Sequence, residues 1–254
     1  LTEPQVGSDA AALKTRAEKT DNGDYVLSGT KQFVTSGEIA EVAIIFAVTD
    51  EAEGKHGITA FLVPADTPGY KVARAEEKLG QKSSDTAQLV FEDMKVPAEC
   101  VLGEVGEGYR LALSNLEAGR IGIAAQSVGM ARAALDFAIQ YAKERESFGQ
   151  PIIQHQAVSF RLADMAAKLK SAELMTLEAA RQKDASIPCL EQACMAKLLA
   201  SEVAEEVCSA AIQTLGGYGY LSEYPVEKIY RDVRVCQIYE GTSDIQRMII
   251  ARGL

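Results

Sequence analysis

The stretch that decides the fold is Val96-Pro97-Ala98-Glu99-Cys100-Val101-Leu102-Gly103-Glu104-Val105-Gly106-Glu107-Gly108, because the residue pattern differs on its two sides. Before it, short apolar runs are separated by turn signals such as Asp21-Asn22-Gly23. After it, apolar residues recur every three to four positions in alanine-rich segments. The three glycines read as a linker. The sequence therefore predicts a β domain over residues 1–103 and a helical domain over residues 104–254.

The β domain is predicted to be an antiparallel sheet or barrel. Its expected strands are Tyr25–Leu27, Val42–Val48, Ile58–Val63, Tyr70–Ala73 and Gln88–Phe91. No helical pattern of crossover length lies between them, and parallel neighbours would need such crossovers.

The helical domain is predicted to contain long antiparallel helices. The expected spans are Gly108–Arg145, Gln154–Lys183 and Ile187–Leu215, with Pro188 in the first turn of the last one. The breaks between them are short, which is typical of antiparallel neighbours in a bundle.

Composition excludes several classes of protein. The 254 residues include 26 Lys and Arg against 36 Asp and Glu, so the net charge is −10 and a nucleic-acid partner is not expected. No apolar run reaches the roughly 20 residues of a membrane span, and no signal-peptide pattern is present. The five cysteines form no CxxC pair and only two histidines occur, so neither a disulfide framework nor a metal site is expected.

One stretch carries a candidate catalytic carboxylate, Tyr239-Glu240-Gly241-Thr242-Ser243-Asp244. Glu240 follows an apolar segment and precedes residues that can cap a helix. Burial beside Ile238 and Tyr239 would raise the pKa of this carboxyl and make it a usable base near neutral pH. The alternative is a solvated glutamate before an ordinary helix cap.

Four further stretches could hold a phosphate or a planar ring, and three of them have a plainer interpretation. The loop Leu1–Asp9 could cradle phosphate or simply be a terminal loop. Phe33 and Thr35, two apart on an extended segment, could cover a ring, or Phe33 could pack in the core. The glycines of Gln213–Tyr220 permit close approach of a ligand. Arg145 suits a pyrophosphate, or is a surface arginine.

Taken together, eight stretches in order resemble the acyl-CoA dehydrogenases, most closely the short-chain and short-branched-chain members. They are Thr2–Asp9, Lys31–Gly37, Gly80–Pro97, Leu116–Gln126, Glu144–Gly149, Gln213–Tyr220, Tyr224–Asp232 and Ile238–Gln246. The resemblance implies an α+β protein, with an antiparallel β-barrel-like middle domain followed by an antiparallel four-helix bundle. The helical domain that opens the family's subunit is expected to lie outside this chain.

The resemblance also implies FAD and assigns site residues. Those expected to bind the cofactor are Thr2, Gly7, Ser8, Phe33, Thr35, Arg145, Phe148, Gln156, Gln213, Leu215, Gly216, Gly217, Thr242 and Asp244. Those expected to bind acyl-CoA are Ser8, Glu117, Arg120, Tyr239 and Gly241. Some family members carry the catalytic base immediately before the arginine that corresponds to Arg120, where this chain has Gly119. Glu117 lies some 200° round the helix from that position, so Glu240 is identified as the base.

The activity implied is α,β-dehydrogenation of a short-chain acyl-CoA, with electrons passed to an electron-transfer flavoprotein. The family also implies a homotetramer with FAD across a subunit boundary, soluble in bacterial cytoplasm or mitochondrial matrix. Two alternatives stay open: a related flavin oxidase or monooxygenase, and a non-catalytic assembly module of the same fold.

Overall fold

The computed structural model describes all 254 residues of the chain, which form two compact units, Leu1–Asn115 and Leu116–Leu254. The division falls within the first long helix, α1 (Gly108–Glu144). The change of sequence pattern comes earlier, at residue 103.

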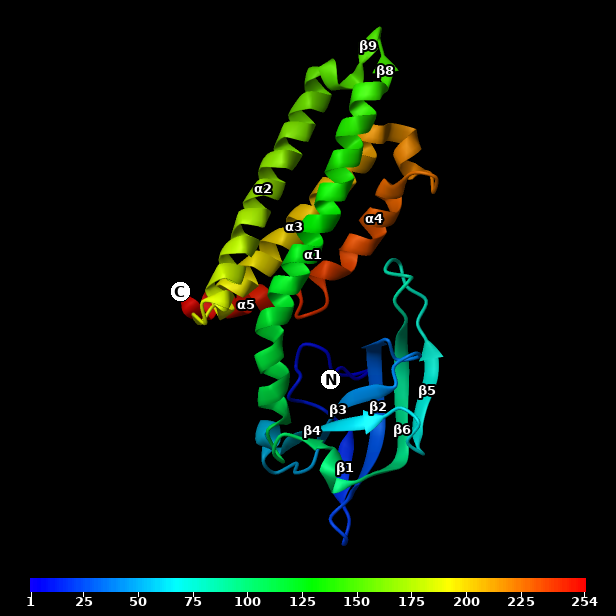
Figure 1. Cartoon of the computed structure of the whole chain (residues 1–254), viewed down its shortest axis with the longest axis vertical. Helices are drawn as coiled ribbons and strands as arrows, with labels where there is room; N and C mark the ends of the chain where they lie inside the picture. The colour runs from blue at the N-terminus through cyan, green and yellow to red at the C-terminus, as the bar shows by residue number, and fades with distance from the viewer. The chain divides into compact units, whose positions relative to one another are not determined.

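The first unit contains a seven-stranded sheet in the order β5-β6-β2-β1-β3-β4-β7 (Figure 1). Its strands are β1 (Arg16–Lys19), β2 (Tyr25–Thr35), β3 (Val42–Val48), β4 (Ile58–Pro64), β5 (Tyr70–Ala75), β6 (Thr86–Val96) and β7 (Val101–Leu102). All strand pairs are antiparallel except β1 with β3, which meet in parallel at Arg16 and Val48. The predicted antiparallel sheet is confirmed, and all five expected strands lie inside observed ones.

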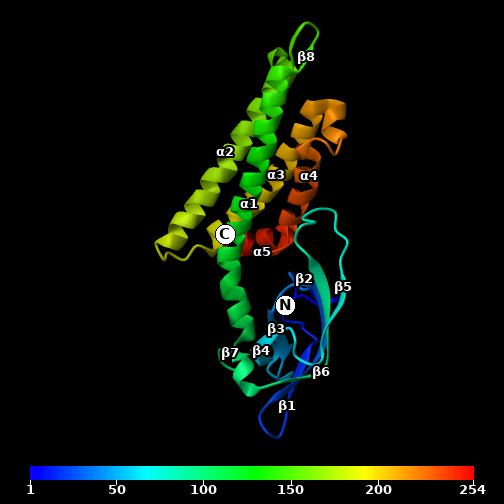
Figure 2. The ribbon, with the colours of Figure 1, turned by 45° about the vertical axis from the view of Figure 1, so that its right-hand side comes forward.

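The main core of this unit lies within its strands, and a smaller cluster of Val6, Leu13 and Ile58 lies apart from it. Alternate residues of neighbouring strands, such as Leu27, Leu89 and Phe91, are almost fully buried. Tyr25 and Phe61 pack edge to face with ring centroids 5.1 Å apart. Figure 2 shows β2, β6 and β5 running side by side, as their pairing requires.

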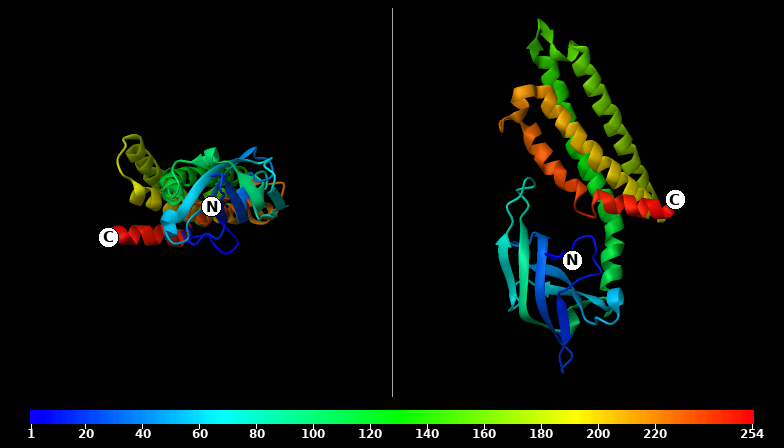
Figure 3. Two further views of the ribbon diagram at one scale, coloured as in Figure 1. Left: turned by 90° about the horizontal axis from the view of Figure 1, so that it is seen from below. Right: turned by 180° about the vertical axis from the view of Figure 1, so that it is seen from behind.

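The second unit is helical. After α1 come α2 (Gln156–Asp184), α3 (Leu190–Leu215), α4 (Pro225–Val233) and α5 (Ser243–Gly253). α3 packs against α2, α4 and α5 (Figure 3). The chain thus has five α helices where the family resemblance implied a four-helix bundle, because two short helices follow the three long ones.

The apolar faces predicted for the long helices are buried. Leu162, Met165 and Leu169 of α2 join Val203 and Val207 of α3 in an alanine-rich core. The predicted start of α3 is wrong by three residues: the helix begins at Leu190, and Pro188 lies in the preceding loop. The α+β class is confirmed.

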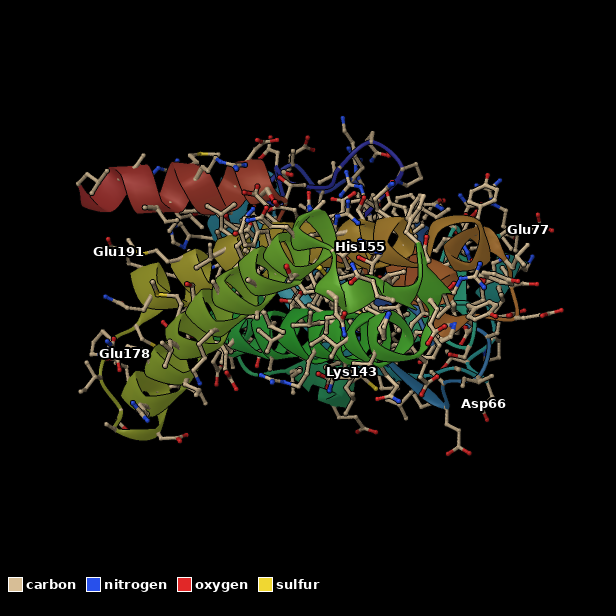
Figure 4. All side chains as sticks on the ribbon, turned by 90° about the horizontal axis from the view of Figure 1, so that it is seen from above. Asp66, Glu77, Lys143, His155, Glu178 and Glu191 are labelled. Atoms are coloured by element: carbon tan, nitrogen blue, oxygen red, sulfur yellow. The ribbon has the colours of Figure 1, made fainter.

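Short connections join the long helices. A hairpin of β8 (Glu146–Ser147) and β9 (Gln150–Pro151) separates α1 from α2. In Figure 4, α2 runs from its N-cap His155 past Glu178, and Glu191 marks the start of α3. No helix of the chain combines the length and apolarity that a bilayer crossing requires.

Candidate active site

Glu240 lies in a short loop between the 3₁₀ turn Arg234–Gln237 and α5. Its φ is +54°, and Gly241 follows with φ +87°. The left-handed region costs a residue with a Cβ roughly 1–2 kcal/mol. Such strain persists only where the surroundings enforce it, and it concentrates at functional sites. The conformation of Glu240 is therefore imposed by its neighbours.

Two buried side chains hold this loop through its carbonyl groups. Gln246 Nε2 donates to Glu240 O at 3.1 Å and to Gly241 O at 2.8 Å. Lys197 Nζ also donates to Gly241 O, at 2.8 Å. Thr242 caps α5 by accepting a hydrogen bond from Ile245 N at 3.3 Å. The loop is thus fixed at Glu240 and over the two residues that follow it.

The carboxylate of Glu240 lies against α1 at Gly119. A Cβ added to Gly119 would come within 2.8 Å of Glu240 Cδ, closer than real contacts allow. Glu240 Oε2 is buried and has no hydrogen-bond partner. Since an unpaired buried polar atom is unfavourable, this oxygen is available to a ligand.

Burial raises the pKa of Glu240, while the positive charges of Arg120 and Lys197 act in the opposite direction. Arg120 is itself buried, and its Nε has no hydrogen-bond partner. A desolvated carboxylate beside two cations has the electrostatics of a base that is ionised yet ready to take a proton.

The sequence attributes the burial of Glu240 to Ile238 and Tyr239, and the structure corrects this in part. Ile238 is half exposed. The Tyr239 hydroxyl donates to Gln126 Oε1 at 2.7 Å, and burial raises the pKa of this phenol. Gly119, which leaves room for the carboxylate because it has no side chain, is a neighbour that the sequence reasoning did not place beside Glu240.

Glu117, one turn from this cluster, is already paired. It accepts a hydrogen bond from Lys183 Nζ at 2.9 Å. That bond holds the pKa of Glu117 below its usual range. A carboxylate whose pKa is lowered by an ion pair is a poorer base than Glu240.

In the first unit, Glu3 organises the terminal loop that contains Thr2, Gly7 and Ser8. Its buried carboxylate accepts hydrogen bonds from Lys14 N at 2.7 Å, Thr15 N at 2.9 Å and Lys31 Nζ at 2.7 Å. Gln32 N donates to Thr2 O at 2.9 Å, which ties the loop to β2. Gly7 and Ser8 are left exposed, with open space beside Gly7.

Phe33 does not pack in the core, so that alternative is wrong. Its side chain is 64% exposed. Nor is its backbone extended: φ is +57°, where the pairing of β2 with β6 shifts register between Lys31 and Val34. Thr35, two residues on, is also exposed. The bulge turns an aromatic ring and a hydroxyl toward solvent.

In the second unit, the predicted cofactor residues form two sets at opposite ends of the helices (Figure 1). The set near the hairpin consists of Arg145, Phe148, Gln156, Gln213, Leu215, Gly216 and Gly217. The set at the start of α5 consists of Thr242 and Asp244. Asp244 is exposed and lies 3.9 Å from Arg247.

One member of the hairpin set, Arg145, lines an aromatic hollow. The guanidinium of Arg145 stands 5.6 Å from the centroid of the Tyr218 ring. These two residues line a hollow of about 380 Å³ with Phe137, Tyr141 and Tyr224. Leu215 is buried, so only its backbone can meet a ligand there.

Phe148, in the turn of the β8–β9 hairpin, is 95% exposed with φ +52°, and its ring contacts that of His155. Gly217 has open space around its Cα. Gly216 has φ +62°, a backbone conformation that favours glycine.

Sequence reasoning missed three residues of the structure described above: Glu3, Lys197 and Gln246. Lys197 left a signal, since it is a charged residue on the buried stripe of α3 that also contains Cys194 and Ser201. Glu3 and Gln246 act through contacts that no local pattern reveals.

Comparison with known proteins places both units in one group. A family model described as acyl-CoA dehydrogenase, middle domain, matches residues 1–94, and one described as acyl-CoA dehydrogenase, C-terminal domain, matches residues 106–254. The mitochondrial short-chain specific acyl-CoA dehydrogenase of Homo sapiens is 49% identical over the whole chain, which covers 61% of that protein. The caffeyl-CoA reductase-Etf complex subunit CarC of Acetobacterium woodii is 46% identical over 99% of the chain and 66% of its own length.

Among solved structures, the butyryl-CoA dehydrogenase of Megasphaera elsdenii superposes with a TM-score of 0.97 and 46% identity. The match covers 100% of this chain and 66% of that one. The chain thus spans 61–66% of the length of these relatives.

Proposed function

Because the chain belongs to the acyl-CoA dehydrogenase family, we propose that the complete enzyme converts a short-chain acyl-CoA thioester to its trans-2-enoyl-CoA. Glu240 removes the α-proton. The observation that carries this proposal is the Glu240 carboxylate, buried with one unpartnered oxygen and held in a left-handed backbone conformation beside Gly119.

The chemistry demanded of Glu240 explains its surroundings. An α C–H is a very weak acid, so the base must be desolvated enough to hold the proton, yet ionised before reaction. Burial supplies the first property, and Arg120 and Lys197 supply the second. Glu117 fails the first requirement, because its ion pair with Lys183 lowers its pKa and so weakens its hold on a proton.

The residues present fit FAD, the cofactor of the family. Open space at Gly7, the exposed hydroxyl of Ser8 and the outward ring of Phe33 suit a pyrophosphate and a planar ring system. Arg145 offers a guanidinium to phosphate oxygens. Bound FAD supplies the acceptor for the hydride that leaves the β-carbon.

The assembly proposed is a homotetramer in which two copies contribute to each cofactor site. The two cofactor-facing sets of the helical unit are separated by most of α3. Gln213 lies 16 positions after Lys197, which contacts the Glu240 loop, so the sets stand about 24 Å apart along the helix. Separate sets are what a cofactor shared between copies requires.

The substrate class and the electron acceptor follow from the relatives. Those compared are named for short-chain acyl-CoA, butyryl-CoA and an Etf complex. We therefore assign this protein a short-chain acyl-CoA substrate and an electron-transfer flavoprotein partner. A location in bacterial cytoplasm or mitochondrial matrix suits that partnership.

The test is anaerobic titration of the complete FAD-loaded enzyme with butyryl-CoA. Bleaching of the flavin absorbance, followed by slow reoxidation in air and rapid reoxidation by electron-transfer flavoprotein, is the expected result. Fast reoxidation by oxygen would instead identify an oxidase. A flavin that never bleaches would identify a non-catalytic module.

A further inference from the structure

Lys197 is a buried cation without a counter-ion of its own. Its side chain has no exposed surface, and it forms no ion pair. Burying an ammonium group is unfavourable unless the group is paired, so lysine is rarely found in this setting. A lysine in this buried position therefore has a role other than packing.

The single hydrogen bond of Lys197 is to the Glu240 loop. Nζ lies 2.8 Å from Gly241 O, an oxygen that also accepts from Gln246 Nε2 at 2.8 Å. Two donors on one carbonyl fix the Gly241–Thr242 peptide, one residue beyond Glu240. Holding this peptide restrains the loop in which Glu240 has its φ of +54°.

Four titratable or charged groups interact electrostatically with Lys197. Glu240 comes from the loop, Arg120 from α1, Cys194 from α3 itself, and Cys236 from the 3₁₀ turn before the loop. Burial lowers the pKa of Lys197 to about 8, with Glu240 and Cys236 opposing the shift and Arg120 adding to it. At neutral pH the group is thus still mainly a cation, and Glu240 is the one carboxylate among these neighbours.

We infer that Lys197 is a positioning residue for Glu240: it holds the loop through Gly241 O and supplies a positive charge that favours the ionised carboxylate. This inference rests on the proposed role of Glu240 as the base. Arg120 lies on another helix and acts on the carboxylate through charge. Lys197 acts both through charge and through the backbone.

The test is a titration of the Glu240 carboxyl by NMR on protein labelled with ¹³C at glutamate Cδ. Glu240→Gln assigns the resonance by removing it. In Lys197→Met, which keeps the side-chain volume and discards the charge, the midpoint of Glu240 should rise by at least about 1 pH unit, as expected for loss of a nearby cation. Lys197→Arg, which keeps a cation at this position, should have a Glu240 midpoint close to that of the parent.

The matched control is Lys170→Met, since Lys170 is an exposed lysine on α2 paired with Glu173. It should leave the Glu240 midpoint unchanged. In a second sample labelled with ¹³C at glutamate Cα, the ¹³Cα shift of Glu240 reports separately on the left-handed backbone, and it should change in Lys197→Met.

An unchanged midpoint in folded Lys197→Met would overturn the inference. Should that variant fail to fold, a Glu240 midpoint in Lys197→Arg more than 1 pH unit above the parent's would do the same. Because the titration needs no turnover, an enzyme that never reduces its flavin but shows the predicted shift would refute the proposed function and leave the electrostatic role of Lys197 intact.

Discussion

At the scale of single residues, the site depends on a glycine as much as on an acid. Gly119 occupies the position before Arg120 where a side chain would collide with the Glu240 carboxylate. The absence of a side chain at Gly119 could be read from the sequence. The reason for it could not, because Glu240 lies 121 positions further along the chain.

Gly119→Ala should slow flavin reduction by about a hundredfold without weakening FAD binding. The added methyl group displaces the carboxylate, and a misplacement of about 1 Å has an effect of this size. Stopped-flow reduction by butyryl-CoA measures the loss.

Gly122→Ala is the control, because Gly122 is on the same helix with nothing within 4 Å of an added Cβ. It should keep the parent rate and stabilise α1 by about 1 kcal/mol. Equal rates of flavin reduction in Gly119→Ala and Gly122→Ala would show that the missing side chain at Gly119 is not needed to place the Glu240 carboxylate.

At the scale of elements, the regular hydrophobic patterns of the sequence predicted the long helices and most of the strands. The run Val42–Val48 became β3 with no change of bounds, and the buried face of α2 follows the expected spacing of Leu162, Met165 and Leu169. The short strand β1 carries no apolar run, so its pairing with β2 depends on tertiary contacts. The bulge at Phe33 was also unforeseen, since its register is set by β6, more than fifty residues away.

The terminal loop offers a test of how β2 is held. Glu3→Gln leaves the Lys31 ammonium buried without its counter-charge, and should destabilise the first unit by about 3–5 kcal/mol at pH 7. Although burial alone would raise it, hydrogen bonds and the charge of Lys31 hold the pKa of Glu3 below its usual range. The stabilisation is therefore present above about pH 4.5 and lost as the pH falls through the folded value.

Urea unfolding at several pH values measures this effect. The difference in the free energy of unfolding between the parent and Glu3→Gln should become smaller as the pH is lowered. Glu38→Gln, at an exposed position near the end of β2, should match the parent throughout. If the difference in unfolding free energy did not depend on pH, the Glu3–Lys31 ion pair would not be its cause.

At the scale of the whole molecule, the homotetramer proposed above has two copies sharing each cofactor site. Arg145, next to the β8–β9 hairpin, stands over the Tyr218 ring, whereas Thr242 caps α5; the hairpin and α5 lie at opposite ends of the long helices (Figure 1). Arg145→Glu should weaken FAD binding at least about tenfold, because a carboxylate would replace a guanidinium that can donate hydrogen bonds to phosphate oxygens.

Flavin retained per subunit after gel filtration checks this prediction. Arg181→Glu, at an exposed arginine of α2, is the matched control. Full flavin occupancy in Arg145→Glu, or a monomer by light scattering with FAD fully bound, would contradict the shared site.

The central claim is that Glu240 is the base, and the rate of anaerobic flavin reduction by butyryl-CoA tests it most directly. Glu240→Gln keeps the size of the side chain and removes its capacity to accept a proton. We expect it to bind FAD and acyl-CoA as the parent does, and to reduce its flavin at least about a thousandfold more slowly. Glu117→Gln should act mainly on acyl-CoA binding. Reduction at the parent rate in Glu240→Gln, with loss of reduction in Glu117→Gln, would contradict the account.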